Sequence, residues 1–471
     1  MSELIDRLIA IKGYENTEDN DSLKEMYRKL LTIAWPAALE GLLLTLMNSF
    51  DTMMVGRIGP EAITAVGLCA QPRMIMLVLA QALCVGTTAV VARRKGEDRQ
   101  DAAVSCLKQS LMIITLIGIA ITLIGNFGSV WLVRLAGAGD DTVGPASLYF
   151  RTISKAFIAN CWALCICAAM RGIGKTRITM VVNMTANVVN VFLNYCLIGG
   201  HFGFPALGVY GAAIATAIGT LVSCVLALSV VLKKGDYLSL RPFTGMHFDK
   251  ETVSSLIHVG GGSIAESVFL RIGFLLNGRL IAGVGTSAYA TNAIVQQVSG
   301  LAFTVGDGTA SACTSLVGQS LGAGKKGKAM LYVKVVQRIA TFLSIILMLF
   351  AFFGRNILPA LFTTDPKIIA MSALCFVVLA VAMYPQNLRV VLSGCLRGAG
   401  DVRYVALVSL ISVLILRPLM TWLFCYPLNQ MFPQYNLGYL GPWISFDIDA
   451  AVREVMLVHR VNKGTWVNIK L

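Results

Sequence analysis

The chain of 471 residues is 56% hydrophobic and 14% charged, with a mean hydropathy of +0.72. Such a chain cannot bury its apolar surface in one water-soluble globule, so the composition predicts a protein whose solvent is lipid. The net charge of +14 would suit nucleic-acid binding, but the basic residues gather between long apolar runs, which argues against that function.

Twelve apolar runs follow one another along the chain, and each can cross about 30 Å of hydrocarbon, which takes roughly 20 residues. The predicted helices of the first half are 30–55, 62–92, 104–125, 144–169, 177–198 and 207–232. Those of the second half are 254–281, 288–318, 330–352, 367–392, 404–427 and 439–459. No segment has the pattern of a barrel strand, so the predicted fold class is an all-α integral membrane protein with twelve transmembrane helices.

Basic residues follow the even-numbered predicted helices, as with Lys95, Lys175, Lys234, Lys326 and Arg397. Positive charge marks cytoplasmic loops, so both termini are predicted to be cytoplasmic in a multi-pass protein of the inner or plasma membrane. The first residues lack the short apolar core of a cleaved signal peptide.

The two halves of the sequence repeat each other. Glu40 aligns with Glu266 at an offset of 266 − 40 = 226, which also pairs Arg171 with Arg397. In the last helix of each half the offset becomes four residues longer. Because each repeat has six helices, both halves enter the membrane in the same orientation, and we expect a substrate cavity between them.

The repeat and the apolar runs together predict the domain organisation. A cytoplasmic segment, 1–29, precedes an N-lobe of helices 1 to 6, 30–232. A cytoplasmic linker, 233–253, joins it to a C-lobe of helices 7 to 12, 254–459, and a cytoplasmic tail, 460–471, ends the chain. The linker has no apolar run and would let the lobes rock in alternating access.

Twelve cysteines lie mostly inside the apolar runs and lack the spacing of metal ligands. We interpret them as packing residues and predict neither a metal centre nor an organic cofactor.

Several motifs carry a resemblance to a known family. They are AWPAALE (34–40), MNSFDTMMVGRIG (47–59), RGIGKTR (171–177), LGVYGAAIAT (207–216), VGQSLGAGKKGKA (317–329) and LRGAGD (396–401). With these motifs in this order, the chain resembles the multidrug and toxic compound extrusion (MATE) family. The resemblance implies two six-helix lobes and export of cationic or amphipathic organic compounds, coupled to inward movement of Na⁺ or H⁺.

Two carboxylates fall within the first predicted helix, where an unpaired charge is costly and therefore indicates function. Asp51 lies eleven residues after Glu40, and eleven steps of about 100° place both acids on one face of the helix. Two structural alternatives stay open. Asp51 could be solvated at the helix end, and Glu40 could be a permanently hydrogen-bonded structural acid.

The resemblance makes Asp51 the ion-coupling aspartate of the first helix. It also implies that Asn190, Asn194 and Thr216 are its polar partners, so these residues and Glu40 form the predicted ion-coupling set. Asp51, Asn190, Asn194 and Thr216 could hold Na⁺ through hard oxygen ligands. Many family members have aspartate where this chain has Asn194, and the lost charge favours H⁺ over Na⁺.

One branch of the family has a second acid pair on helices 7 and 10, but the matching positions here are Leu270 and Gln386. The C-lobe has other charged residues at apparent membrane depth, most of which we expect to form neutralising pairs. They are Glu266, Asp307, Asp447 and Asp449 with Arg271, Arg389, Arg417 and Arg453. The predicted candidates for the substrate cavity are Glu266, Asp307, Gln386 and Arg389.

The sequence therefore predicts a secondary active antiporter that exports organic compounds in exchange for H⁺ or Na⁺. The alternative is a flippase for a lipid-linked saccharide, which the arginines of the C-lobe leave open. An integral membrane enzyme would need a juxtamembrane catalytic cluster, and the sequence shows none. The expected partners are small organic substrates and the lipid bilayer, with no nucleic acid. Oligomeric state cannot be read from the sequence, and a monomer is the simplest expectation.

Overall fold

The computed structural model describes residues 22–56, 58–241, 248–469 and 471, and within them the chain forms helices and no strand. Most of the predicted N-terminal segment (1–21) and part of the predicted linker (242–247) lie outside the described residues. The chain divides into two compact units. The N-unit is Leu39–Gly260, and the C-unit is Gly261–Leu471 together with the described residues up to Ala38.

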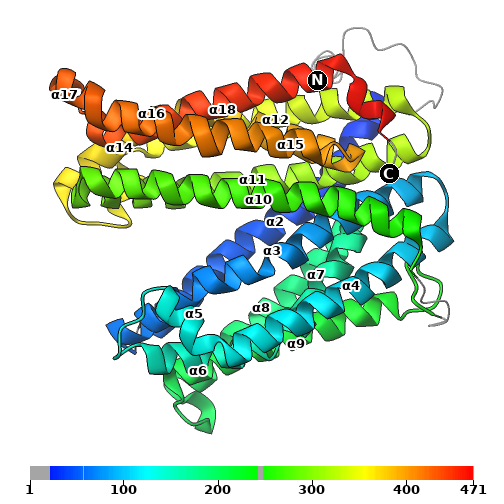
Figure 1. Ribbon diagram of the computed structural model, residues 1–471, viewed down its shortest axis with the longest axis horizontal. Helices are drawn as coiled ribbons and strands as arrows, with labels where there is room; N and C mark the ends of the chain where they lie inside the picture. The colour runs from blue at the N-terminus through cyan, green and yellow to red at the C-terminus, as the bar shows by residue number, and fades with distance from the viewer. Residues whose placement is uncertain (1–21, 57, 242–247, 470) are drawn as a thin grey trace. The chain divides into compact units, whose positions relative to one another are not determined.

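The helices of the first half begin with α2, whose residues from Leu39 onward belong to the N-unit; Figure 1 labels these helices. They are α2 (Leu23–Gly56), α3 (Pro60–Gly96), α4 (Gln100–Phe127), α5 (Ser129–Leu135), α6 (Val143–Ser154), α7 (Phe157–Gly172), α8 (Thr176–Gly199) and α9 (Gly208–Val231). Helix α3 packs on α4 and α7, and α8 packs along α9. A buried apolar cluster joins α3, α4, α7 and α9.

The helices of the second half begin with α10, whose first residues still belong to the N-unit. They are α10 (Lys250–Val284), α11 (Thr286–Gly322), α12 (Lys326–Gly354), α13 (Ile357–Ala360), α14 (Pro366–Ala399), α15 (Val402–Ser409), α16 (Arg417–Leu423), α17 (Asn429–Met431) and α18 (Leu437–Lys463). Helix α14 is central to the C-unit because it packs on α11, α12 and α18.

Nine helices of the described chain are long and apolar enough to cross a membrane, or ten if the bent pair α6 and α7 forms one span. Helices α11 and α18 have similar lengths but are not among them. Helix α11 is rich in serine, threonine and glycine, and α18 contains Asp447, Asp449 and Arg453. Counting these two, the twelve predicted transmembrane helices are present, and the all-α fold class is confirmed.

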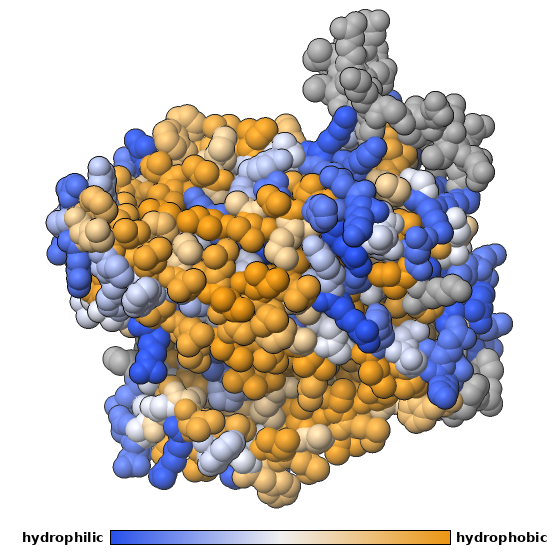
Figure 2. Space-filling view, turned by 45° about the horizontal axis from the view of Figure 1, so that its top comes forward, coloured by the Kyte–Doolittle hydropathy of each residue, from blue (hydrophilic) through white to orange (hydrophobic). Residues whose placement is uncertain are grey.

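Large apolar side chains remain exposed on many helices, among them Leu116, Val225, Phe342 and Leu275. On the face shown in Figure 2, hydrophobic residues cover a broad middle expanse and hydrophilic residues gather at its margins. An exposed apolar surface of this extent is typical of contact with lipid. The chain is therefore a multi-pass membrane protein.

The fourth predicted helix, 144–169, is not continuous. Helices α6 and α7 are bent by 50° relative to each other, at a break after Ser154. The Ser154 hydroxyl donates to the carbonyl oxygen of Phe150 at 2.7 Å, and such bonding by a serine within a helix favours a bend. The apolar pattern runs through the break, which is why the sequence predicted one helix.

The internal repeat is visible in the hydrogen bonds. The Thr88 hydroxyl donates to the Ala168 carbonyl at 3.0 Å, and the Thr314 hydroxyl donates to the Gly394 carbonyl at 2.8 Å. Both residues of the second bond lie 226 positions after those of the first (314 − 88 and 394 − 168). The two-lobe internal repeat is thus confirmed.

Equivalent glycines begin α3 and α11. Gly59 and Gly285, again 226 apart (285 − 59), have φ values of 151° and 145°. Side chains with a Cβ rarely adopt such a φ, so glycine is required at both positions for the chain to enter the long second helix of each half.

Candidate functional site

The predicted ion-coupling residues of α2 and α8 lie together in the N-unit. The Asn194 side-chain amide donates to the Asp51 carboxylate at 2.7 Å and lies 3.4 Å from the Asn190 side-chain oxygen. Asn194 is 1% exposed and Asn190 is 7% exposed, whereas Asp51 is half-buried. Asp51 therefore accepts a hydrogen bond from a buried side chain while its own side chain stays partly exposed at the surface of the protein.

The other end of the Asn194 amide has no hydrogen-bond partner. Its Oδ1 is buried and unpartnered within the described residues. A buried oxygen without a donor is costly, and here it belongs to the side chain that also contacts the Asp51 carboxylate. Carboxylate and amide oxygens are suitable ligands for a hard cation, so the residues present fit Na⁺ as well as a proton on Asp51.

Thr216 on α9 does not bind Asp51 directly. Its hydroxyl donates to the Ala212 carbonyl of the preceding helical turn at 2.9 Å. The buried Tyr149 hydroxyl of α6 interacts with Thr216 instead. The structure thus brings Asp51, Asn190 and Asn194 together and places Thr216 beside them with Tyr149.

Arg73 of α3 is a component of this site that the sequence analysis missed. Its charge acts on both Asp51 and Tyr149, and its side chain is half-buried. Arg73 is the only charged residue in the predicted helix 62–92. A lone cation within an apolar run was the signal that could have identified it.

Glu40 lies in a separate polar group. Its carboxylate accepts hydrogen bonds from the Thr179 hydroxyl at 2.9 Å and the Asn183 amide at 2.6 Å, and it is 3.7 Å from the Arg171 guanidinium. Glu40 is 7% exposed, so these contacts satisfy a buried carboxylate. The arrangement is what a structural acid requires, and a role of Glu40 in ion coupling stays a prediction.

The C-unit repeats this pair. Arg397 donates two hydrogen bonds to Glu266, at 2.6 Å and 3.3 Å. The offset of 226 relates Glu266 to Glu40 and Arg397 to Arg171. Each half of the protein therefore has one buried glutamate paired with an arginine at the end of its fourth helix.

The C-unit does not repeat the acid of the ion-coupling site. The position 226 residues after Asp51 is Asn277 (277 − 51), whose side-chain oxygen accepts from the Thr421 hydroxyl at 2.6 Å. Thr421 lies one residue beyond the position that matches Asn194 (194 + 226 = 420). The π-helical turns at Leu410–Leu416 account for such a shift because a π turn takes up an extra residue.

Asp449 forms a buried cluster with two arginines. Arg417 and Arg453 both donate to its carboxylate, as does the Ser412 hydroxyl. Asp449 is 0% exposed, and the arginines are 2% and 3% exposed. This part of the expected charge neutralisation is present.

Two other charged residues of the C-unit lack such partners. Arg271 Nε and Asp447 Oδ1 are buried and have no hydrogen-bond partner among the described residues. The expectation of neutralising pairs therefore fails for these two atoms.

The remaining predicted cavity residues lie on α11 and α14. Arg389 Nε donates to the Gln386 side-chain oxygen at 2.6 Å, and Gln386 is 2% exposed. Asp307 is exposed, and the charges of Arg389 and Arg397 act on it. The four predicted residues thus belong to one charged region of the C-unit.

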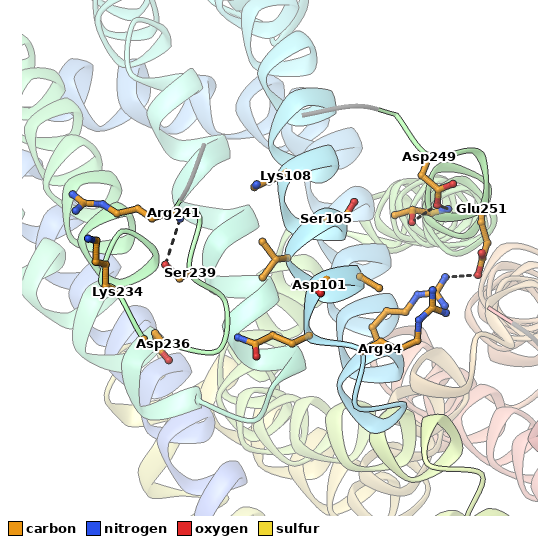
Figure 3. Close-up of a pocket in the computed structure, with 16 residues that line it drawn as sticks. Arg94, Asp101, Ser105, Lys108, Lys234, Asp236, Ser239, Arg241, Asp249 and Glu251 are labelled. Carbon is orange, nitrogen blue, oxygen red and sulfur yellow. Dashed lines mark hydrogen bonds and ion pairs between the residues drawn. The ribbon is translucent and has the colours of Figure 1, made fainter. Parts of the chain in front are cut away.

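A cavity of about 1460 Å³ lies elsewhere in the N-unit, between the end of α3, the beginning of α4 and the segment that precedes α10 (Figure 3). Charged residues contribute to its walls, with Arg99, Lys108 and Lys234 among the basic ones and Asp101 and Asp236 among the acidic ones. None of the predicted site residues lines it. We assign it no role in coupling.

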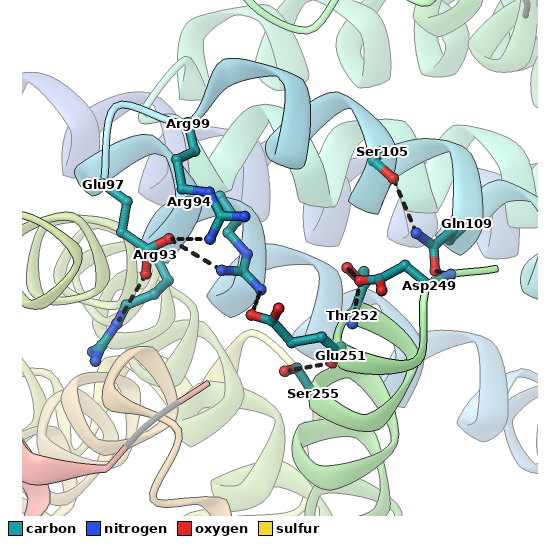
Figure 4. Close-up of polar contacts among 10 residues, drawn as sticks. All are labelled: Arg93, Arg94, Glu97, Arg99, Ser105, Gln109, Asp249, Glu251, Thr252 and Ser255. Carbon is teal, nitrogen blue, oxygen red and sulfur yellow. Dashed lines mark hydrogen bonds and ion pairs between the residues drawn. The ribbon is translucent and has the colours of Figure 1, made fainter. Parts of the chain in front are cut away.

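Polar contacts at this cavity attach the beginning of α10 to α3 and α4 (Figure 4). Arg94 donates to Glu251 at 2.6 Å and to Glu97 at 3.1 Å, and Gln109 accepts from the Asp249 backbone amide at 3.1 Å. Helix α10 begins at Lys250, so the end of the predicted linker (233–253) is already helical and held in place.

Two carboxyl groups of this region have lowered pKa values. Hydrogen bonds from the Thr252 backbone amide and hydroxyl lower the pKa of Asp249. Partial burial raises the pKa of Asp236, but its hydrogen bond with Lys175 and that residue's charge outweigh burial, so the pKa is lowered overall. Both groups are therefore charged at neutral pH and strengthen the attachment of the segment before α10.

Comparison with known families identifies both halves of the chain. The MatE family model matches residues 36–196 and again 263–423. A "Probable multidrug resistance protein NorM" of Thermotoga maritima is 25% identical over 96% of this chain and 96% of its own length. The "Multidrug resistance protein PmpM" of Pseudomonas aeruginosa is 29% identical over 82% of this chain and 81% of its own.

The fold also has solved counterparts. The structure described as "Crystal structure of MATE in complex with MaD3S" superposes with a TM-score of 0.85 at 21% identity, covering 93% of this chain and 97% of the other. At this identity the similarity establishes the fold. The double match of the family model agrees with the repeated hydrogen bonds and glutamate–arginine pairs described above.

Proposed function

Because this chain belongs to the multidrug and toxic compound extrusion (MATE) family, we propose that it is a secondary active antiporter that exports organic compounds in exchange for H⁺ or Na⁺. The names of the relatives support multidrug efflux. The observation that carries the coupling proposal is the contact of Asp51 with Asn194, whose Oδ1 is buried without a partner.

In this proposal Asp51 alternates between a charged and a neutralised state. A proton or cation that reaches the half-buried carboxylate removes the cost of an unpaired charge in a low-dielectric site. Asn190, Asn194 and Thr216 would then supply oxygen ligands or hydrogen bonds to the occupied site. Ion binding shifts the protein between its outward and inward states, and substrate export completes the cycle.

We favour H⁺ as the coupling ion because residue 194 is an asparagine. A cation bound at this site would therefore be held by the single negative charge of Asp51, without the second carboxylate that an aspartate at position 194 would supply. Arg73 adds a positive charge that acts on Asp51, which further disfavours a second cation. We also propose that the protein lies in the inner or plasma membrane with both termini in the cytoplasm, a proposal supported by the basic residues that follow the even-numbered helices.

The second candidate is a flippase for a lipid-linked saccharide. Arg417 and Arg453, which are buried around Asp449, and the half-buried Arg389 favour it, because a cationic interior would suit the phosphates of such a lipid. Binding of an undecaprenyl-linked saccharide without ion-dependent dye efflux would support this alternative over the antiporter.

The test uses purified protein in vesicles loaded with a cationic dye, with a pH gradient and a Na⁺ gradient imposed separately. Wild type should extrude dye under at least one gradient, and Asp51→Asn, which imitates the neutral form, should not. Asn277→Ala is the matched control because it changes the equivalent position of the other half. Efflux by Asp51→Asn at nearly the wild-type rate would overturn the coupling role of Asp51.

A further inference from the structure

Arg389 is a cation within a membrane helix without a carboxylate partner. Its Nε donates to the neutral Gln386 amide oxygen at 2.6 Å, and no described carboxylate lies within the 4.0 Å that defines an ion pair. The other arginines of this interior differ, since Arg397 is paired with Glu266, and Arg417 and Arg453 share Asp449. A guanidinium within a membrane helix is expensive unless an anion accompanies it.

The group that receives Arg389 is itself incompletely bonded. Gln386 is 2% exposed, and its Nε2 is buried without a hydrogen-bond partner in the described chain. Its oxygen is occupied by Arg389, so the amide presents a donor and the guanidinium presents further donors beside it. Arg389 is half-buried, so an anionic group could reach it and accept hydrogen bonds from these unused donors.

Aromatic rings border these donors. The Arg389 guanidinium carbon lies 5.7 Å from the Phe303 ring centroid. Phe303 packs edge-on against Phe446 at 6.3 Å, and Phe446 packs against Trp443 at 5.6 Å. Trp443 Nε1 is a further buried donor without a partner in the described residues. The local surface therefore combines hydrogen-bond donors, one unbalanced positive charge and flat apolar rings.

The acids of this region do not pair with Arg389. Asp307 forms no ion pair among the described residues, although the charges of both Arg389 and Arg397 act on it. The Asp449 carboxylate is already shared by two other arginines. Asp307 and Asp447 both lack an ion pair among the described residues, so neither acid neutralises Arg389 directly, and a carboxylate supplied by a ligand would lower the electrostatic free energy of this guanidinium.

We propose that Arg389 and Gln386 bind the carboxylate of an aromatic substrate against Phe303. The inference rests on the proposed export function and specifies its substrate class: aromatic organic acids and zwitterions, in addition to the cations that the family resemblance implies. A guanidinium holds a carboxylate through parallel hydrogen bonds, and the ring positions the aromatic part of the same molecule.

The test measures equilibrium binding with no ion gradient. Dansylglycine, an aromatic carboxylate, and dansylglycinamide, its uncharged analogue, are titrated into the protein in nanodiscs while dansyl fluorescence is recorded. Wild type should bind the acid at least tenfold more tightly than the amide, a difference that one charge-assisted hydrogen bond can supply. Arg389→Gln should bind both probes equally, and Gln386→Leu should reduce the preference.

The control is Arg355→Gln, which removes another C-unit arginine that lies over a phenylalanine, Phe352, at 4.8 Å. It should keep the wild-type preference. Thermal unfolding shows whether each variant is folded, and Arg389→Lys, which keeps the charge, should restore part of the preference. Equal binding of acid and amide by wild type, or an undiminished preference in Arg389→Gln, would overturn the proposal.

Two further experiments distinguish the carboxylate site from a lipid-binding site and from the antiporter proposal. If phosphatidylglycerol in the nanodisc competes with dansylglycine in wild type and not in Arg389→Gln, the site belongs to a lipid phosphate and the substrate assignment is overturned. If the Arg389-dependent preference is present and neither gradient drives dye efflux in vesicles, the antiporter proposal fails while the carboxylate site is supported.

Discussion

Asp51 and Asn277 occupy equivalent positions in the two halves, yet only Asp51 is ionisable. Each accepts a hydrogen bond from the same region of the partner helix, from Asn194 and from Thr421. The repeat therefore preserved the geometry of this contact while its chemistry diverged. That divergence places the proposed coupling in the N-unit and leaves the C-unit available for substrate contacts.

The sequence indicated some residues of this candidate site and not others, for different physical reasons. Asp51 and Asn194 were paired through the family resemblance, because a motif carries the position of each residue. The resemblance also implies Thr216 as a polar partner, and its hydroxyl bonds to the Ala212 carbonyl, so Thr216 lies beside Asp51 without a direct hydrogen bond to it. Arg73 was missed because its proximity to Asp51 depends on how α3 packs, which neither a motif nor a helical period reveals.

At the residue scale, Asn194→Asp should change the coupling ion. The amide now donates to Asp51 at 2.7 Å, and a second carboxylate at that distance could not stay charged beside the first without a cation or proton between them. We expect Na⁺-driven dye efflux to rise relative to H⁺-driven efflux. Vesicle efflux under separate gradients measures the ratio, and an unchanged ratio with active protein would contradict the role of position 194.

The elements of the structure follow the apolar runs closely, because a spanning helix must be both long and apolar. The departures arise where backbone bonding changes without a change in hydropathy. The break after Ser154 and the π turns at Leu410–Leu416 are of this kind. Hydropathy also ranks α11 and α18 low, because both helices are partly polar, and several of their polar side chains, such as Thr291, Thr314 and Asp449, are buried.

At this scale, the equivalent glycines at the ends of α7 and α14, Gly172 and Gly398, should be intolerant of side chains. A Cβ on Gly172 would lie 2.7 Å from the Thr88 carbonyl oxygen, and one on Gly398 would lie 2.4 Å from that of Thr314. We expect valine at either position to destabilise the protein by about 1–3 kcal/mol through overpacking.

Thermal unfolding in detergent measures this effect. Gly67→Val is the control, since a Cβ on Gly67 meets no atom within 4 Å. Gly172→Val and Gly398→Val should both unfold at a lower temperature than this control. Wild-type unfolding temperature and transport in both variants would show that the close approach is not needed.

Helix α10 contains three consecutive glycines at the boundary between the units, which falls between Gly260 and Gly261. A Cβ on Gly261 meets no atom within 4 Å, so Gly261→Ala is sterically permitted. Alanine should stiffen the helix by roughly 0.5–1 kcal/mol relative to glycine. The variant should therefore unfold at a higher temperature. If α10 bends at Gly261 during transport, the variant should also transport more slowly.

The matched control is Gly278→Ala, because Gly278 lies in the same helix, away from the boundary, and is equally open. It should gain stability without loss of transport. Equal transport rates for the two variants would rule out bending at Gly261.

At the scale of the whole molecule, the sequence predicted the number of helices, the repeat and the family, because these depend on composition and on the order of motifs. The compact units, however, divide the chain at Ala38 and Gly260, whereas the predicted lobes begin at residues 30 and 254. The difference arises because α2 and α10 each contribute residues to both units. A division by helix number cannot show which parts of a long helix pack with which neighbours.

The orientation of the whole chain in the membrane gives the last prediction. Basic residues follow the even-numbered helices, and six helices per repeat give both halves the same orientation. His201 follows α8, the fifth span, so an alkaline phosphatase fused after it should be active outside the cytoplasm. Lys326 follows the eighth span, α11, so a green fluorescent protein fused after it should fluoresce inside. Each fusion is exchanged for the other reporter as a control, and the reverse pattern at both sites would overturn the cytoplasmic placement of the termini.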